Sequence, residues 1–372
     1  MRKKVIVSVI NDLVTDQRVN KVCETLELID CDVLLVGRKM RNSPKLDSRG
    51  YKMHRMNLMF EKGPLFYAEF NVRLFFYLLT KKADMLIAND LDTLLPNHLV
   101  RFIKKTPLIY DSHEYFTEVP ELVSRKHIQA IWKFIERKLF PKQTDIITVN
   151  DSIAGLFEND YGIRPSVVRN IPRKRLPVEK VSKKKLGLPE NSHVIILQGS
   201  GINVDRGSEE LIEAMQFVNN AVLLIVGGGD VIDTLKLMTK KFEIEQKVIF
   251  KPRVPYLQLM QYTAIADLGL TLDKSTNLNY KFSLPNKLFD YIQSGVPILS
   301  SRLPEIESII QQYDVGDFIS DHIPQNIAKR INQILSNPVQ MEKWKKNCKF
   351  AASELTWENE EKVLIDIYSK YV

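Results

Sequence analysis

Residues 193–218 read HVIILQGSGINVDRGSEELIEAMQFV, and this stretch decides the fold. Its first part, His193–Leu197, is a short continuous apolar run, as expected for a strand buried on both faces. A glycine-containing turn follows, and Ser208–Val218 then shows helical spacing of apolar residues. A buried strand followed by a helix is the unit from which parallel sheets are built. The stretch therefore predicts an α/β protein with a parallel sheet covered by helices on both faces.

The same strand–helix unit recurs on both sides of this stretch. Further strands are predicted from similar apolar runs at Val5–Ile10, Asp32–Val36, Asp84–Ala88, Leu108–Tyr110, Asp145–Val149, Val222–Val226, Val248–Lys251, Leu268–Thr271 and Ile298–Ser300. The repeated strand–helix units predict two doubly wound halves. We predict an N-terminal domain over residues 1–170, a basic linker over 171–190, a C-terminal domain over 191–355 and a last helix within 356–372.

The segment between the halves is rich in lysine, arginine and proline. Residues 164–185 carry most of its positive charge, from Arg164 to Lys185. Charged, proline-rich stretches between periodic segments are typical of linkers. Two interpretations stay open: a solvated linker, or a patch that faces a membrane or another polyanion.

Composition narrows the class of protein and its partners. The chain has 372 residues, 53 Lys and Arg against 45 Asp and Glu, and a formal net charge of +8. This charge favours an anionic partner such as a nucleotide, a phospholipid surface or a nucleic acid. Three cysteines without metal-ligand spacing indicate a reducing compartment. No apolar run reaches the roughly 18 residues of a membrane-spanning helix, so we expect a cytoplasmic protein.

Polar clusters follow the predicted strands of the first half. They are Asn11-Asp12, Asn89-Asp90, Asp111–Glu114 and Asn150-Asp151. Loop and helix-cap chemistry explains most such residues, because Asn and Asp are favoured there. His113 differs, because an imidazole between two acids can bond a sugar hydroxyl or meet a developing charge. The triplet Asp90-Leu91-Asp92 could hold a divalent metal, but Asp92 opens a helical run where an acid suits the helix dipole, so no metal is expected.

Glycines and one arginine follow the first strands of the second half. Gly199-Ser200-Gly201 lacks the third glycine of a dinucleotide-binding loop, and no P-loop sequence is present. Arg206-Gly207 stands at the entrance to the next helix, where a guanidinium can bind a diphosphate. Gly227–Gly229 either lets a backbone approach a ligand or forms a simple turn.

The segment 282–291, FSLPNKLFDY, is the most informative for function. Pro285 suits a first helical turn. The free amides at that helix start can cradle a phosphate, and Lys287 adds a point charge. Asp290, one turn later, could accept hydrogen bonds from ribose hydroxyls. The alternative is an ordinary helix with Lys287 and Asp290 on its wet face.

These residues, in this order, resemble the retaining glycosyltransferases of the two-domain GT-B type, family 4 (glycosyl transferases group 1), of the kind that assembles bacterial polysaccharides. The segment 284–291 followed by Gly295-Val296-Pro297 is similar to that family's donor-binding helix. The resemblance spans nearly the whole chain. Looser matching features are Asp16–Val19, Tyr110–Glu114, Arg206-Gly207, Arg253-Val254 and Trp357-Glu358.

The resemblance implies a GT-B fold, two Rossmann-like domains facing across a cleft, with the last helix crossing back to the first domain. It implies transfer of a sugar, with retention and without a metal or other cofactor, from a UDP- or GDP-sugar to a saccharide or lipid-linked acceptor, such as a growing surface polysaccharide. His113 would contact the transferred sugar, Arg206 and Lys287 would hold the diphosphate, Asp290 the ribose, and the Val254 backbone the base. The full implied donor set is Ser200, Gly201, Asn203, Arg206, Gly207, Gly228, Arg253, Val254, Leu284, Pro285, Asn286, Lys287, Leu288 and Asp290. The implied acceptor set is Asn11, Asp12, Asp16, Arg18, Asp90, His113 and Glu114.

Three positions depart from the family pattern. Ser200 stands where the family often has an arginine, so one phosphate-binding charge is missing. Asp290 replaces a glutamate, which shortens the reach by one methylene. Phe282 replaces the usual second glutamate, which ordinarily helps to hold the transferred sugar.

Other functions remain open at this point. A nucleotide-sugar 2-epimerase shares the architecture and would consume donor without an acceptor. A non-catalytic nucleotide-binding module and a basic nucleic-acid-binding protein are further alternatives, although the basic run lacks interleaved aromatics and no nucleic acid is expected as a partner. The apolar segment Phe66–Leu79 is either a core helix or, with the basic run, part of a surface that docks on the inner face of the cell membrane.

Overall fold

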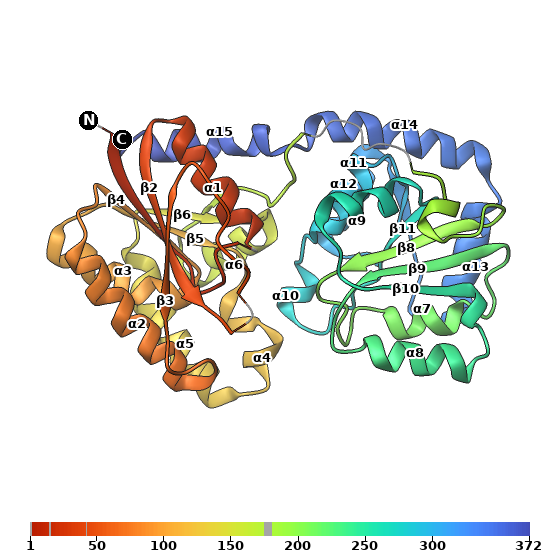
Figure 1. Ribbon diagram of the computed structural model, residues 1–372, viewed down its shortest axis with the longest axis horizontal. Coiled ribbons are helices and arrows are strands. Elements are labelled where there is room, and N and C mark those ends of the chain that lie inside the picture. The colour runs from red at the N-terminus through yellow and green to blue at the C-terminus, as the bar shows by residue number, and fades with distance from the viewer. Residues whose placement is uncertain (1, 15, 42, 175–180) are drawn as a thin grey trace. The chain divides into compact units, whose positions relative to one another are not determined.

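The computed structural model describes residues 2–14, 16–41, 43–174 and 181–372. The chain forms two compact units (Figure 1). The first contains the residues up to Asn170 together with Glu358–Val372, and the second contains Ile171–Trp357. Both chain ends therefore belong to the first unit.

A parallel sheet forms the centre of the first unit. Among its described residues seven strands occur, in the order β3 (Lys52–Asn57), β2 (Cys31–Lys39), β1 (Lys3–Ser8), β4 (Met85–Asn89), β5 (Leu108–Ser112), β6 (Asp145–Thr148) and β7 (Ser166–Val167). Each neighbouring pair is parallel. Val5, Ile6 and Val7 of β1 are all buried, because helices cover both faces of such a sheet.

Helices connect these strands. They are α1 (Gln17–Leu28), α2 (Gly63–Thr80), α3 (Leu91–Lys104), α4 (Pro120–Val123), α5 (Lys126–Leu139), α6 (Asp151–Tyr161) and α15 (Trp357–Tyr368), with short 3₁₀ turns at Phe116–Glu118 and Phe140–Lys142. Asp16 caps α1 by accepting a hydrogen bond from the Val19 amide, and Asn150 caps α6 through the Ile153 amide. Helix α15 lies within the predicted last segment, residues 356–372, and its residues from Glu358 onward belong to the first unit.

A second parallel sheet forms the centre of the second unit. Its order is β10 (Val248–Lys251), β9 (Ala221–Gly227), β8 (His193–Gly199), β11 (Leu268–Thr271), β12 (Ile298–Ser300) and β13 (Gly316–Phe318). The helices are α7 (Ser208–Ala214), α8 (Ile232–Lys241), α9 (Tyr256–Ala264), α10 (Leu278–Lys281), α11 (Asn286–Gln293), α12 (Pro304–Tyr313), α13 (Pro324–Leu335) and α14 (Pro338–Glu354), with 3₁₀ turns at Lys184–Leu186 and Glu245–Lys247. The fold class predicted from residues 193–218, a doubly wound α/β protein, is confirmed.

Two apolar cores cover the two faces of the second sheet. One contains buried residues of α7, α8 and α13, and the other those of α9, α11 and α12. Ile171, Leu186 and Leu188 belong to the second of these cores. Both flanks of the predicted basic linker are therefore packed against this unit, while residues 175–180 of that linker lie outside the described part of the chain.

Strands β3, β7 and β13, each at the edge of its sheet, escaped prediction. The β3 sequence KMHRMN has no apolar run, and only Met56 within it is buried, because β3 is an edge strand. The three residues of β13 are half-buried at the edge of the second sheet. Over the residues that the structure describes, no helix has both the length and the apolar character needed to cross a bilayer.

Candidate functional site

Polar residues gather at the carboxyl ends of β4 and β5 in the first unit. Asp90 follows β4, while Asp111 and Ser112 end β5 and His113 comes next. These strands are hydrogen-bonded neighbours, with Asn89 paired to Asp111. Parallel strands end at the same edge of a sheet, and ligands of doubly wound sheets bind at that edge. The structure thus brings three of the predicted residues together: Asp90, Asp111 and His113.

His113 lies between two carboxylates. Its Nε2 is 3.4 Å from Asp111 Oδ2, and its Nδ1 is 3.5 Å from Asp90 Oδ2. The His113 backbone amide also donates to Asp90 Oδ1 at 2.8 Å. Burial by itself lowers the pKa of His113, but the Asp90 and Asp111 carboxylates outweigh it and raise that pKa to about 9. The imidazole is therefore a cation at neutral pH, with its side chain 16% exposed.

Arg18 completes this chain of charges from α1. Its Nη2 is 2.8 Å from Asp111 Oδ1, and its Nη1 donates to the Val168 carbonyl at 2.8 Å. Burial raises the pKa of Asp111, but Arg18 and His113 together lower it well below the ordinary value. Arg18 is only 3% exposed, so its guanidinium stabilises Asp111 from inside the unit rather than facing solvent.

Asp90 adopts an unusual backbone conformation. Its φ is +59° with ψ 167°, a region that residues other than glycine rarely occupy. This conformation lets the Asp90 carboxylate accept a hydrogen bond from the His113 backbone amide through one oxygen and face the His113 ring with the other. Asp92, the other acid of the triplet, is buried in α3 and is 5% exposed. Across the described ranges, no group of three His, Cys, Asp or Glu side chains is arranged as metal ligands would be.

Asp12 and Asp16 make contacts within the first unit. Asp12 is 1% exposed, and its carboxylate accepts from Arg55 Nη2 at 2.8 Å and from the Ser43 hydroxyl. Asp16 caps α1, and Asn11 Nδ2 donates to it at 3.4 Å. These contacts fix the loop after β1. An acceptor-binding role for Asn11, Asp12, Asp16, Arg18 and the half-buried Glu114 stays a prediction.

Two cations predicted to bind phosphate meet at one carboxylate in the second unit. Arg206 Nη1 is 3.2 Å from Asp273 Oδ2, and Lys287 Nζ is 3.9 Å from Asp273 Oδ1. Asp273 is fully buried, whereas the Arg206 and Lys287 side chains are 25% and 12% exposed. The Arg206 guanidinium also stacks over the Tyr280 ring, with its Cζ 4.4 Å from the centroid.

Sequence reasoning missed Asp273. It comes two residues after β11, so it is a polar residue behind a buried strand, the same signal that pointed to His113 in the first half. Burial lowers the pKa of Lys287, Asp273 raises it, and Arg206 lowers it further, with a net lowering. Asp273 therefore helps to keep Lys287 protonated beside a second cation.

Lys287, one of the three residues of this cluster, belongs to the first turn of α11. Pro285 is its N-cap residue, and no side chain of the described residues caps it. Lys287 is the second residue of the helix, while Leu288 is fully buried in the core and anchors the first turn. Leu284 is half-buried and Asn286 is exposed. Uncapped amides next to a lysine are suited to bind a phosphate group.

Asp290 points into the unit. It is 6% exposed, and its carboxylate accepts from Gln198 Nε2 at 3.2 Å and from the Tyr256 hydroxyl. The alternative of a wet helix face is therefore wrong for Asp290, because its side chain is buried among these partners. Its proposed contact with a ribose stays a prediction.

The glycines of β8 and β9 serve the packing of two loops. A Cβ atom at Gly227, whose φ is +139°, would collide with the Gly199 carbonyl, and one at Gly229 would collide with the Ile202 carbonyl. Gly201 has open space around it, where only Asn203 Nδ2 comes within 3.9 Å of an added Cβ. The two loops can therefore touch backbone to backbone.

Other predicted donor residues border these loops. Arg253 Nη2 donates to the Ser200 carbonyl at 2.6 Å, and the Arg253 side chain passes over Gly228. Gly207, with φ +69°, lies against the Leu272 carbonyl, where a side chain would not fit. Val254, next to Arg253, is half-buried against the core. The structure thus places most predicted donor residues on loops at the carboxyl edge of the second sheet.

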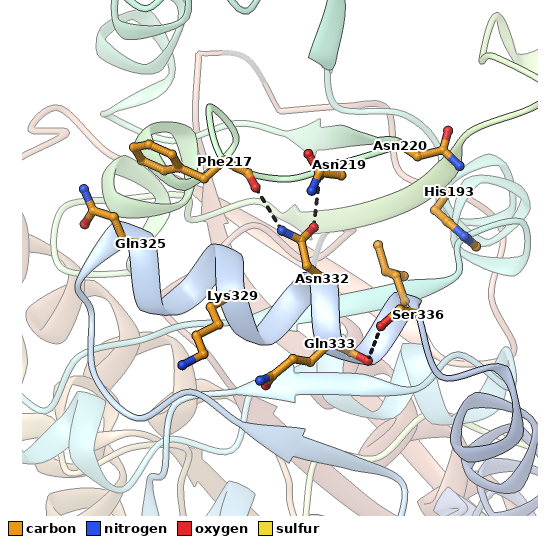
Figure 2. A pocket seen from close by; sticks show the side chains of 10 residues that line it. His193, Phe217, Asn219, Asn220, Gln325, Lys329, Asn332, Gln333 and Ser336 are labelled. Atoms are coloured by element: carbon orange, nitrogen blue, oxygen red, sulfur yellow. Dashed lines mark hydrogen bonds between the residues drawn. The ribbon is translucent and has the colours of Figure 1, made fainter.

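A separate pocket of about 660 Å³ opens at the other edge of this sheet (Figure 2). His193 at the start of β8 and the loop before β9 line one side of it, and α13 lines the other. Asn332 on α13 accepts from the Asn219 amide at 3.0 Å and donates to the Phe217 carbonyl at 2.9 Å. This pocket is therefore distinct from the cluster of Arg206, Asp273 and Lys287.

Comparisons with known proteins agree with this architecture. Residues 178–350 match the model of the family described as Glycosyl transferases group 1. N-acetyl-alpha-D-glucosaminyl L-malate synthase of Bacillus anthracis is 24% identical over 246 residues. That match covers 65% of this chain and 54% of the relative, so it spans about half the length of that protein.

Solved structures resemble the chain over nearly its whole length. Sucrose-phosphate synthase from Thermosynechococcus elongatus has a TM-score of 0.80 at 16% identity, covering 99% of each chain. Anabaena Alr3699/HepE in complex with UDP and glucose has a TM-score of 0.75 at 13% identity, covering 99% of this chain and 100% of the other. The chain has the GT-B fold. Within its second half, residues 178–350 are similar to the glycosyl transferases group 1 family.

Proposed function

We propose that the protein is a glycosyltransferase that moves a sugar from a nucleotide-sugar donor to a hydroxyl acceptor. The observation that carries this proposal is the meeting of Arg206 and Lys287 at the buried Asp273, in the unit that carries the family domain. Two cations beside an uncapped helix start form a site for a diphosphate. The relatives support the donor class, since one solved structure contains UDP and glucose.

The proposed chemistry follows from where charge develops. Breaking the bond between the sugar and the diphosphate leaves positive charge on the sugar ring and negative charge on the leaving phosphate. Arg206, Lys287 and the amides at the start of α11 would stabilise that phosphate, and donors fixed before the reaction are worth roughly 3–4 kcal/mol each. We further propose that the transfer proceeds with retention, without a metal or other cofactor, and that His113 contacts the transferred sugar.

The proposed acceptor is a saccharide or a lipid-linked saccharide, such as a growing surface polysaccharide. The relative from Bacillus anthracis supports an acceptor with a hydroxyl group, because its name places a glucosaminyl group on L-malate. We also propose that the protein works at an anionic membrane surface, which would bring it close to a lipid-linked acceptor.

Thermal unfolding with nucleoside diphosphates tests the donor site first. The panel is UDP, GDP, ADP, CDP and their common sugars, each with and without EDTA. A ligand at about 100 times its Kd adds roughly 2.7 kcal/mol to the stability of the state that binds it. We expect one base to raise the Tm by several degrees with EDTA present. A rise that EDTA abolishes would contradict metal-independent binding.

Donor turnover then separates the proposal from its rivals. With the base known, release of nucleoside diphosphate is measured with and without a saccharide acceptor. Acceptor-dependent release supports transfer. Release without acceptor and with an epimerised sugar would show a 2-epimerase, while binding without any turnover would show a binding module. A gel shift at physiological salt would show nucleic-acid binding and overturn the proposal.

A further inference from the structure

We propose that the exposed sides of α2, α3 and α5 in the first unit form a docking face for an anionic lipid bilayer. The docking face is defined by eight exposed apolar side chains: Leu65, Val72 and Phe76 of α2, Leu99, Phe102 and Ile103 of α3, and Ile131 and Phe134 of α5. This inference rests on one part of the proposed function, namely that the protein works at an anionic membrane surface. It names the surface and the residues that would carry it.

The three helices are neighbours. α2 packs against α3, and α3 packs against α5 (Figure 1). Phe102 is 83% exposed, Phe134 is 61% exposed and Phe76 is 61% exposed. Large apolar side chains scattered singly are normal on a surface, whereas eight of them on three neighbouring helices are more than such scatter, and exposed apolar patches mark interaction sites.

The sequence of α2 explains why it contributes to this face. The helix is apolar on nearly all sides, GPLFYAEFNVRLFFYLLT, but buries only Phe66, Phe70, Leu74 and Leu78. These four are spaced by four residues and form one stripe against the unit. The remaining apolar residues, including Val72 and Phe76, point away from that stripe. Helices that are apolar all round are normally covered, so α2 lacks a cover in this unit.

The accessible charges carried by the three helices are mostly positive, although Lys133 pairs with Glu118 at 2.6 Å and Lys104 Nζ donates to the Leu78 and Lys81 carbonyls. Their basic residues are Arg73, Arg101, Lys104, Lys126, Lys133, Arg137 and Lys138. The acidic residues of these helices are largely inaccessible to solvent. Asp92 is 5% exposed and Glu136 is 1% exposed, while Glu69 is ion-paired with Arg73 and has a side chain 9% exposed. The docking face thus combines apolar side chains with basic ones.

The combination of apolar and basic side chains indicates what binds to the docking face. An apolar face rimmed by Lys and Arg is the composition that binds at the interface of anionic bilayers. A second copy of the chain would place the same basic rim against itself, which like-charge repulsion disfavours. The basic segment at 164–185 is a weaker candidate for docking, because Arg164 pairs with Asp151 and Glu158, and Arg169 pairs with Glu360.

Vesicle co-sedimentation tests the docking face. The full chain is mixed at low salt with vesicles of phosphatidylglycerol and phosphatidylcholine, or of phosphatidylcholine alone. We expect binding to the anionic vesicles that weakens as salt rises. The double variant Phe102→Ser with Phe134→Ser should bind at least about tenfold more weakly, because each phenyl group loses its apolar burial. The matched control is Leu237→Ser with Phe350→Ser, two residues of the second unit that are 68% and 60% exposed.

Several outcomes would overturn this inference. They are absence of wild-type binding to anionic vesicles, equal binding by the Phe102 and Phe134 double variant, and loss of binding in the control variant. Sedimentation velocity that shows a dimer lost in that double variant, without vesicle binding, would show a contact between copies instead. Thermal shifts with nucleoside diphosphates on the same samples keep the two proposals apart, because they report on the second unit and need no vesicles.

Discussion

Lys287 is the residue whose removal most directly tests the donor site. Its charge would stabilise the leaving phosphate more strongly in the transition state than in the bound donor. We expect Lys287→Ala to lower turnover about 100-fold or more while the Tm stays close to that of the wild type. The measurement is release of nucleoside diphosphate with a saturating acceptor. Lys281→Ala, an exposed lysine in the same segment, is the control, and near-normal turnover in Lys287→Ala would contradict the role.

Asp273 sets how donor binding depends on pH. It raises the pKa of Lys287 against burial and against Arg206, so Asp273→Asn should lower that pKa further. In the proposed donor site a protonated Lys287 would bind phosphate, so the affinity for the nucleoside diphosphate should fall as pH rises through the pKa of Lys287. We expect the fall to begin at a lower pH in Asp273→Asn than in the wild type, measured by titration calorimetry with the nucleoside diphosphate. Asp233→Asn, an exposed site, should leave the profile unchanged.

His113 should make stability depend on pH. Its folded pKa, about 9, lies above its ordinary value of 6.5. The stabilisation is therefore complete below pH 6.5 and disappears as pH rises through 9. We expect His113→Asn to reduce the free energy of unfolding by at most about 3 kcal/mol near pH 6, with the difference shrinking by pH 9.5. Urea unfolding of both proteins at pH 6 and pH 9.5 measures it, and a difference that does not shrink with rising pH would contradict the role of the two carboxylates.

At the level of elements, the loops after β8 and β9 depend on glycine. Gly227→Ala forces a Cβ into the Gly199 carbonyl and strains a φ of +139°. Gly295 also has a positive φ, +71°, but nothing lies within 4 Å of an added Cβ there. Gly295→Ala should therefore cost about 1 kcal/mol, the price of the backbone conformation alone. Gly227→Ala should cost about 3 kcal/mol or more. Equal losses in urea unfolding would contradict the packing of these loops.

The elements also show how far sequence reasoning reaches. Continuous apolar runs predicted β1 and β8, because strands buried on both faces need no alternation. The same rule missed the edge strand β3, because only Met56 within it is buried and its other residues are half-buried or exposed. At the site, His113 was predicted because polar residues follow the end of a buried strand. Lys287 was predicted from its position at the start of a helix. The partners of Asp12 and Arg18 could not be predicted, because Arg55 and Val168 are distant in sequence and only the folded sheet brings them near.

At the level of the whole molecule, α15 completes the first unit. Leu364 and Tyr368 are fully buried, and Glu360 accepts from the Arg169 amide and guanidinium. Deleting Glu358–Val372 should lower the Tm of the first unit by several degrees, because it uncovers this apolar surface. The second unit should keep its thermal shift with the nucleoside diphosphate. Calorimetry with and without nucleotide measures both, and Lys362→Ala on the exposed side of α15 is the control.

The second unit is closed where the chain enters and leaves it. The Trp357 amide donates to the Pro172 carbonyl at 2.9 Å, so the last residue of this unit is hydrogen-bonded to its second residue. Residues 171–357 are therefore an insert within the first unit rather than a tail that follows it. An insert whose ends already meet can be exchanged as one cassette without stretching its host. If the proposed donor and acceptor sites are right, replacing it with the equivalent piece of another GT-B chain should change the choice of donor and leave the choice of acceptor unchanged.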